Sequence, residues 1–240
     1  MTPLLQVDAL EVALGGVPVV EGVSLAVERG EIVAILGRNG AGKTTVLRAI
    51  AGAQPMAGGS VRLEGDTISG WPAHRVAAAG CVLVLEGHRV FLHQSVETNL
   101  RLGAYHAPSR EVDSRLSEQF ERFAVLAAKR RVLAGQLSGG EQQLLAVAQG
   151  LMAAPRLLLL DEPSIGLDEG VVTWLFMILD GLRHQGMGLL VAEQSVDQVL
   201  DVAGRAYVLQ SGRVVAHRPA RELRGDRVLR DAYLGLAIRP

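Results

Sequence analysis

The chain has 240 residues, 49% of them apolar and 20% charged, with a formal net charge of -1 and 4% aromatic residues. This length allows one large domain or two small ones with a buried core, and the charge balance and few aromatics argue against a nucleic-acid partner. The chain has a single cysteine and no secretory-signal pattern, and no apolar run approaches the length of about 18 residues that a membrane span needs. We therefore expect a cytoplasmic protein.

The first predicted elements are a strand, a glycine loop and a helix. Residues 32–36 form an apolar run, and residues 43–53 place Val46, Leu47 and Ile50 on one helical face. Between them, "GRNGAGKTT" matches G-x-x-x-x-G-K-[ST], a loop whose glycines let backbone N–H groups surround a phosphate. A chance glycine turn before a helix is the alternative, and the strand–loop–helix context argues against it.

This loop predicts a nucleotide site. Lys43 is expected to reach the β- and γ-phosphates, and the Thr44 hydroxyl to bind Mg²⁺. The residues expected to contact the nucleotide are Gly37, Arg38, Asn39, Gly40, Ala41, Gly42, Lys43, Thr44 and Thr45.

The remaining elements predict an α/β fold. Residues 58–68 indicate a hairpin that turns at Gly65–Asp66, and residues 97–154 are mostly helical in pattern. Further on, the patterns predict a buried strand at 156–163, a helix at 168–186, a buried strand at 188–194 and a hairpin at 205–218 that turns at Ser211–Gly212. Because buried strands alternate with helices, the core sheet should be mostly parallel, and the helical middle is interpreted as an inserted subdomain. The charged stretch 217–230 is expected to be a solvated tail.

An acidic pair follows the leucine-rich strand. Asp161 is expected to hold the hydration shell of Mg²⁺, and Glu162, pointing the opposite way, to orient or deprotonate the attacking water. A strand end with simple turn chemistry is the alternative.

A second anion site is indicated at the start of a later helix. Ser138 and Glu141 form a capping-box pattern, which alone explains a helix start. Gly139 and Gly140 contribute nothing to a cap, so two glycines and a serine at this helix start indicate a second phosphate-binding surface. Because it lies far from the first in the sequence, we infer that it contacts a nucleotide bound by a partner.

These motifs, in this order and spacing, resemble the ATP-binding subunit of an ABC transporter, and the resemblance covers essentially the whole chain. It implies a P-loop NTPase of ABC type: one domain over residues 1–240, with a mostly parallel core sheet, an N-terminal antiparallel β part and a helical subdomain inserted over about residues 88–154. It implies ATP and Mg²⁺ as cofactors. It also implies two subunits sandwiching two ATP molecules, with Ser138, Gly139 and Gly140 of one facing the nucleotide bound by the other.

The implied partners are a second ATPase subunit, in a homo- or heterodimer, membrane permease subunits and, indirectly, a solute-binding protein. The implied location is the cytoplasmic face of the inner membrane. "EGHRVF" at Glu86–Phe91, "AEQS" at 192–195 and the final "AYLG" resemble more closely the smaller ATPase of branched-chain amino-acid uptake systems.

The resemblance assigns further roles by position. Glu86 stands where ABC proteins usually have a glutamine that contacts Mg²⁺ and water, and Gln194 where they usually have a histidine at the γ-phosphate. The amino-acid uptake branch departs at both places. The implied catalytic residues are therefore Glu162, Gln194 and Glu86, and the implied metal-binding residues are Thr44, Asp161 and Glu86. Leu14 replaces the aromatic that usually stacks on adenine, so we expect a looser, apolar base contact.

The activity inferred is ATP hydrolysis that powers an importer for branched-chain amino acids. Since a glutamine amide can donate a hydrogen bond but cannot become cationic, Gln194 should slow or retune hydrolysis rather than remove it. The alternatives are a urea or short-amide importer, a non-transport ATPase that remodels a soluble complex, and a catalytically inactive nucleotide sensor.

Overall fold

The computed structural model describes residues 2–87 and 89–234. His88, inside the stretch that resembles the uptake ATPases and at the predicted start of the inserted subdomain, lies outside the described residues, as does Gly235 of "AYLG".

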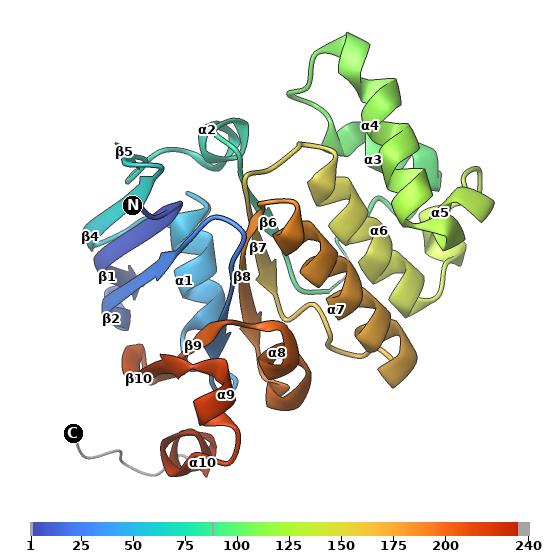
Figure 1. Cartoon of the computed structure of the whole chain (residues 1–240). Helices are drawn as coiled ribbons and strands as arrows, with labels where there is room; N and C mark the ends of the chain where they lie inside the picture. Colours follow the sequence, from blue (N-terminus) through green and yellow to red (C-terminus); the bar gives the residue numbers. More distant parts are fainter. Residues whose placement is uncertain (1, 88, 235–240) are drawn as a thin grey trace.

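Two sheets form the centre of the molecule (Figure 1). A four-stranded antiparallel sheet has the order β2-β1-β4-β5, and a six-stranded sheet has the order β10-β9-β3-β8-β7-β6. Within the second sheet only β9 and β10 pair antiparallel. The strands are β1 Leu5–Leu14, β2 Val17–Val27, β3 Ile32–Leu36, β4 Gly58–Leu63, β5 Asp66–Thr67, β6 Cys81–Val84, β7 Leu157–Asp161, β8 Gly188–Glu193, β9 Arg205–Gln210 and β10 Arg213–Pro219. The predicted fold class is therefore confirmed.

The helices lie on both sides of the six-stranded sheet. They are α1 Lys43–Ile50, α2 Ala73–Ala78, α3 Val96–Gly103, α4 Ser109–Arg122, α5 Ala124–Ala128, α6 Gly139–Leu151, α7 Glu169–His184, α8 Val196–Val202, α9 Ala220–Leu223 and α10 Arg227–Leu234, with a 3-10 turn at Ala134–Gln136. Helices α3 to α6 follow one another between β6 and β7. In Figure 1, α1 and the antiparallel sheet lie on one side of β7 and β8, and α7 and α6 lie on the other. No helix of the described part of the chain is long and apolar enough to cross a membrane.

Strand β3 connects two separate cores. Its side chains at positions 32, 34 and 36 pack in one hydrophobic cluster, and those at 33 and 35 pack in the other. This follows from the period-2 alternation of a strand that is covered on both faces. The second cluster contains Val46, Leu47 and Ile50 of α1, the residues predicted to form its apolar face.

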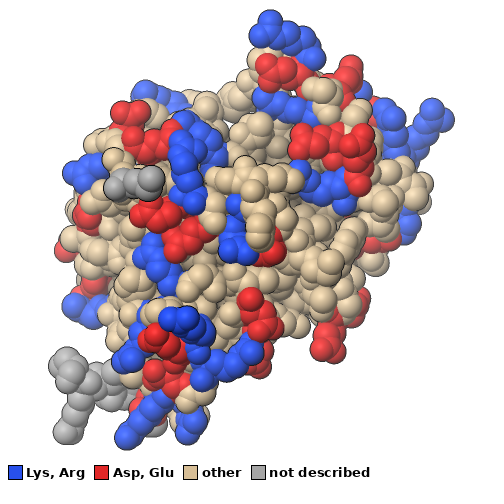
Figure 2. Space-filling view, in the orientation of Figure 1, with Lys and Arg blue, Asp and Glu red and all other residues tan. Residues whose placement is uncertain are grey.

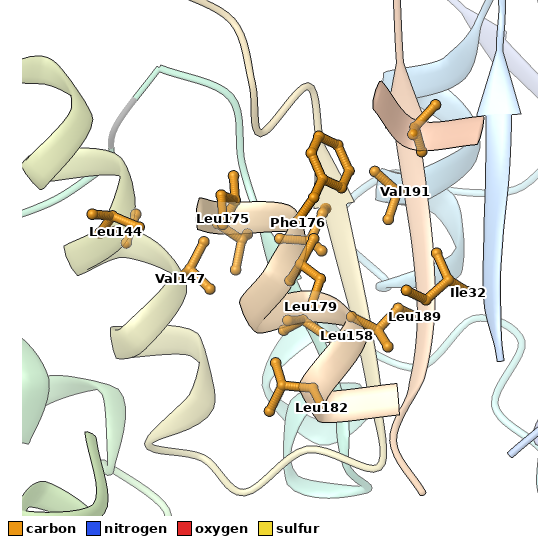
Figure 3. Close-up of a cluster of buried hydrophobic side chains, with 14 of the residues drawn as sticks. Ile32, Leu144, Val147, Leu158, Leu175, Phe176, Leu179, Leu182, Leu189 and Val191 are labelled. Carbon is orange, nitrogen blue, oxygen red and sulfur yellow. The ribbon is translucent and has the colours of Figure 1, made fainter. Parts of the chain in front are cut away.

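Helix α7 fills the other side of the sheet. Figure 3 shows its side chains Leu175, Phe176, Leu179 and Leu182 between strand residues and those of α6. All four are 4% exposed or less. Burying a side chain of this size stabilises the fold by about 1.5–3 kcal/mol, so this layer fixes α6 and α7 relative to the strand ends.

One hairpin turn is shifted and one is confirmed. Leu63 pairs with Asp66, so the turn residues are Glu64 and Gly65, and the prediction of Gly65–Asp66 was wrong by one position. Both turn residues have positive φ, 54° and 90°, the geometry that suits a two-residue hairpin. The predicted turn at residues 211–212 is confirmed, because Arg213 pairs with Gln210.

The expectation of a solvated tail was wrong. Residues 217–230 include the end of β10, all of α9 and the start of α10. Leu223 and Leu229 in this stretch are buried, and so is Ala232 further along α10. The apolar residues are few, but they lie on one side of short helices and hold α10 against the body of the protein.

Candidate functional site

The phosphate loop lines a cleft at the carboxyl end of β3. The cleft has a volume of about 340 Å³ and is lined by loop residues 38–40 and 42–45 together with Val19, Glu86 and Glu162. A side chain at Gly37 would collide with the backbone oxygen of Leu209, so glycine is required there by close packing.

Lys43 is held by three oxygens. Its Nζ donates to the carbonyl oxygens of Gly37 at 2.7 Å and Arg38 at 3.3 Å. It also forms an ion pair with Glu162 Oε1 at 3.0 Å, and the two side chains are only 3% and 7% exposed. A buried pair of this kind places the lysine charge and the glutamate carboxylate side by side in the cleft.

Thr44 and Asp161 form the second contact between the loop and β7. Thr44 Oγ1 donates a hydrogen bond of 2.9 Å to Asp161 Oδ1. Asp161 Oδ2 is buried and has no hydrogen-bond partner among the described residues. Burial raises the pKa of the Asp161 carboxyl; the nearby Glu162 and Glu86 carboxylates raise it further, and the Thr44 hydrogen bond acts against the rise.

These groups fit Mg²⁺, which prefers oxygen ligands and keeps several of its waters. Asp161 Oδ2 is an unpaired buried acceptor beside a hydroxyl oxygen, and Glu86 lines the same cleft. Across the described residues no group of three or more His, Cys, Asp or Glu side chains is arranged to hold a metal alone.

Asp161→Asn is expected to raise the unfolding temperature in the absence of Mg²⁺. Folding raises the pKa of the Asp161 carboxyl, so the ionised form present at pH 7 is less favourable in the folded state than in the unfolded state and lowers the free energy of unfolding. An asparagine amide carries no charge and removes this cost. The apparent Mg²⁺ affinity in ATP turnover should fall about 10- to 100-fold. Thermal melting in EDTA and Mg²⁺ titration of turnover measure the two effects. The control is Asp180→Asn, an α7 carboxylate paired with Arg183, and a lower melting temperature with unchanged Mg²⁺ dependence would contradict the assignment.

Glu162 adopts an unusual backbone conformation. Its φ is 45°, the left-handed region that non-glycine residues rarely adopt. Its N–H donates to the Ala192 carbonyl at 2.8 Å. Because the chain leaves the strand geometry here, the predicted opposite orientation of the two carboxylates does not hold: Asp161 contacts Thr44 and Glu162 contacts Lys43 on the same turn of α1.

A second cleft adjoins the first at Glu162. It has a volume of about 500 Å³, and its lining includes Glu162, Ser164, Glu193 and Gln194. Gln194 is exposed at the end of β8, and its carbonyl accepts a hydrogen bond of 3.0 Å from the Tyr233 hydroxyl. Gln194 therefore lines the second cleft and not the phosphate-loop cleft, and Glu162 lines both.

Other predicted residues lie apart from this site. The predicted capping box is confirmed, since Ser138 and Glu141 exchange both hydrogen bonds at the start of α6. In Figure 1, β7 and β8 lie between α6 and α1, and residues 138–140 line neither cleft. Leu14, 43% exposed, ends β1 and does not line the phosphate-loop cleft, whereas Val19 of β2 does.

Two residues near Gln194 were not predicted to act at the site. Glu193 is 2% exposed, and its carboxylate contacts the backbone of both flanking loops. The sequence signal was an acidic residue ending a fully apolar strand. Burial raises the pKa of the Tyr233 hydroxyl to about 12, although a hydrogen bond from the Gly37 backbone acts the other way. Nothing in the local sequence pattern pointed to this contact.

Comparison with known proteins identifies the class. The ABC transporter family model matches residues 20–165. The high-affinity branched-chain amino acid transport ATP-binding protein BraG of Pseudomonas aeruginosa is 39% identical over 97% of this chain and 100% of its own length. The lipopolysaccharide export system ATP-binding protein LptB of Escherichia coli is 35% identical over 93% of each chain. A solved ATP-binding cassette of an ABC transporter in its ADP conformation shares the fold, with a TM-score of 0.87 and 24% identity over 98% of this chain and 100% of that one.

The chain belongs to the ABC transporter ATP-binding family. It binds and hydrolyses ATP, and ABC ATPase subunits pair with permease subunits in a transporter complex. The resemblance to the branched-chain amino-acid branch is confirmed by BraG, whereas the exporter relative LptB leaves the direction and substrate of transport open.

Proposed function

We propose that this chain powers the import of branched-chain amino acids from the cytoplasmic face of the inner membrane. The observation that carries the proposal is its similarity to BraG over 97% of this chain and the full length of BraG. The chain would act as one of two ATPase subunits bound to membrane permeases, with a solute-binding protein delivering the amino acid.

In this proposal the residues of the phosphate-loop cleft bind Mg²⁺·ATP. Lys43 holds the β- and γ-phosphates, and its ion pair with Glu162 opens as phosphate oxygens replace the carboxylate. Thr44, Asp161 and Glu86 would hold the metal and its water, and a bound Mg²⁺ would supply positive charge beside the phosphates. Glu162 then takes a proton from the attacking water, and Gln194 donates a hydrogen bond to the γ-phosphate.

The second half of each site comes from the partner subunit. Ser138, Gly139 and Gly140 lie at the N-terminus of the 13-residue helix α6, where backbone N–H groups favour an anion. Since these residues do not line the clefts of their own chain, we propose that they contact ATP held by the second subunit.

An apolar surface next to Glu86 supports permease docking. Phe91, Leu92 and Leu133 are 54%, 47% and 43% exposed. The buried Asn99 fixes this segment, because its side chain accepts from the Phe91 N–H at 2.7 Å and donates to the Phe91 carbonyl at 3.0 Å. An exposed apolar segment on a rigid support is suited to contact with another protein. On the face drawn in Figure 2, acidic and basic side chains are intermixed.

Reconstitution with the membrane subunits tests the proposal. A tagged chain should co-purify with permease subunits from its native membrane, and in proteoliposomes a binding protein loaded with leucine, isoleucine or valine should stimulate ATP turnover. Stimulation by urea or a short amide alone would favour the alternative importer. Recovery with only soluble proteins would favour a remodelling ATPase and contradict the proposal.

Gln194→Ala is expected to lower turnover, whereas Gln194→His is expected to preserve it. The alanine has no donor for the γ-phosphate, and the histidine supplies one at the same place. Losing one such donor costs about 10²- to 10³-fold in the rate constant. Phosphate release by the purified variants measures the effect, and equal, unchanged turnover in both would mean that Gln194 serves only as a polar link between β8 and α8.

A further inference from the structure

Glu193 is a buried carboxylate between two loops of the site. It ends β8, whose six residues are all buried, and it is itself 2% exposed. In the sheet it pairs with Leu36, the last residue of β3 before the phosphate loop. A carboxylate at this depth is costly unless its oxygens accept several hydrogen bonds.

The two carboxylate oxygens serve different loops. Oε1 accepts a 3.0 Å hydrogen bond from the backbone N–H of Ser164. Oε2 accepts from the N–H of Gln194 at 3.1 Å and that of Ser195 at 3.4 Å. Ser195 occupies the N-cap position of α8, as predicted, but its side chain makes no capping hydrogen bond. The Glu193 carboxylate instead holds the N–H of Ser195 itself, just before the first turn of α8.

The first of these loops carries the proposed base. Ser164 lies two residues after Glu162, and the Ile165 N–H donates to the Glu162 carbonyl at 3.2 Å, closing a tight turn. Two hydrogen bonds join this turn to β8. The Glu162 N–H donates to the Ala192 carbonyl, and the Ser164 N–H donates to the Glu193 carboxylate. Of these two hydrogen bonds, only the second depends on a side chain.

The second loop carries the proposed phosphate contact. The backbone of Gln194 is held on both sides, its N–H by Glu193 and its carbonyl by Tyr233. Among the described residues, the Glu193 carboxylate is the one side chain that bonds both to this backbone and to the turn after Glu162. Because proton transfer and phosphate contact need sub-ångström positioning, a change in the distance between the two loops would slow catalysis without removing any group that touches ATP.

We propose that Glu193 is a positioning residue that keeps Gln194 and the Glu162 turn in fixed relation during hydrolysis. The inference rests on the proposed roles of Glu162 and Gln194. In this proposal Glu193 acts through the backbone N–H groups of Ser164, Gln194 and Ser195, which its carboxylate holds.

Glu193→Gln tests this role with minimal change in shape. A glutamine has one acceptor oxygen instead of two, so the N–H of one loop loses its partner and faces an amide NH₂. The rate constant kcat should fall about 10- to 100-fold, while the KM for ATP stays within about twofold, since Lys43 and the phosphate loop are unchanged. Steady-state phosphate release measures both constants.

The matched control is Glu31→Gln. Glu31 is also a partly buried carboxylate that accepts a backbone N–H, from Glu28 at 2.9 Å, and it pairs with Arg205 at 2.7 Å. It directly precedes β3, at the opposite end of the strand from the phosphate loop. This variant should lower the melting temperature and leave kcat unchanged.

A double variant separates positioning from general damage. If Glu193 acts partly through Gln194, Glu193→Gln should slow the Gln194→Ala variant by a smaller factor than it slows the native protein. Multiplied losses would overturn the inference, as would a normal kcat in Glu193→Gln or a loss that appears mainly in KM. If Glu162→Gln leaves turnover unchanged, the catalytic role proposed for Glu162 fails instead, whatever Glu193→Gln shows. Melting curves confirm that each variant is folded at the assay temperature.

Discussion

Replacing Glu162 by glutamine is expected to reduce ATP turnover about 10²- to 10⁴-fold, the contribution usual for a positioned general base. The amide keeps the size of the side chain and can still lie beside Lys43, 3.0 Å away in the native protein. It cannot accept the proton of the attacking water. ATP should therefore still bind, and dimers that contain unhydrolysed ATP should accumulate.

Phosphate release measures the loss of turnover, and size-exclusion chromatography with ATP and Mg²⁺ measures the dimers. Glu118→Gln is the control. This α4 carboxylate is 58% exposed, pairs with Arg122 and lines neither of the two clefts. Turnover in Glu162→Gln within twofold of the native protein would exclude Glu162 as the base. A variant that stays monomeric with ATP would count against the two-subunit site.

Lys43→Met is expected to abolish nucleotide binding and also to destabilise the protein by about 3–5 kcal/mol, because it leaves a buried carboxylate without its partner. The Lys43–Glu162 pair is almost fully buried, so solvent cannot compensate for the missing charge. Adding Glu162→Gln to Lys43→Met should recover most of the stability, since the second change removes the unpaired charge, but it should not restore binding.

Urea unfolding gives the stabilities, and a fluorescent ATP analogue gives the affinities. The only other lysine in the sequence, Lys129, provides a matched control. It is 40% exposed and pairs with Glu141, so Lys129→Met should cost only about 0–1 kcal/mol. If the double variant were as unstable as Lys43→Met, the ion pair would not be the source of the destabilisation.

The sequence predicted the core strands well because burial on both faces leaves a continuous apolar run. Residues 32–36 were predicted as a strand, and β3 has the same bounds. The strand predicted at 156–163 is shorter, Leu157–Asp161, because the chain turns at Glu162. The shifted hairpin turn at Glu64–Gly65 had no such signal, since either dipeptide with Gly65 is compatible with a turn.

The contacts that organise the candidate site were harder to predict because they join distant residues. The Lys43–Glu162 pair depends on the left-handed backbone at Glu162, which no local pattern indicates. The Glu193–Ser164 hydrogen bond joins residues 29 positions apart. Motif spacing identified which residues have the required chemistry, and the tertiary fold decides which of them meet.

The division of the interior by β3 has a consequence for how such a protein diverges. The apolar residues of α1 pack in one cluster, and those of α3 to α6 pack in the other. A substitution inside the helical group therefore repacks its own neighbours without displacing the helix that follows the phosphate loop. We therefore expect substitutions among α3 to α6 to change the surface of that group while the packing beneath the phosphate loop is kept.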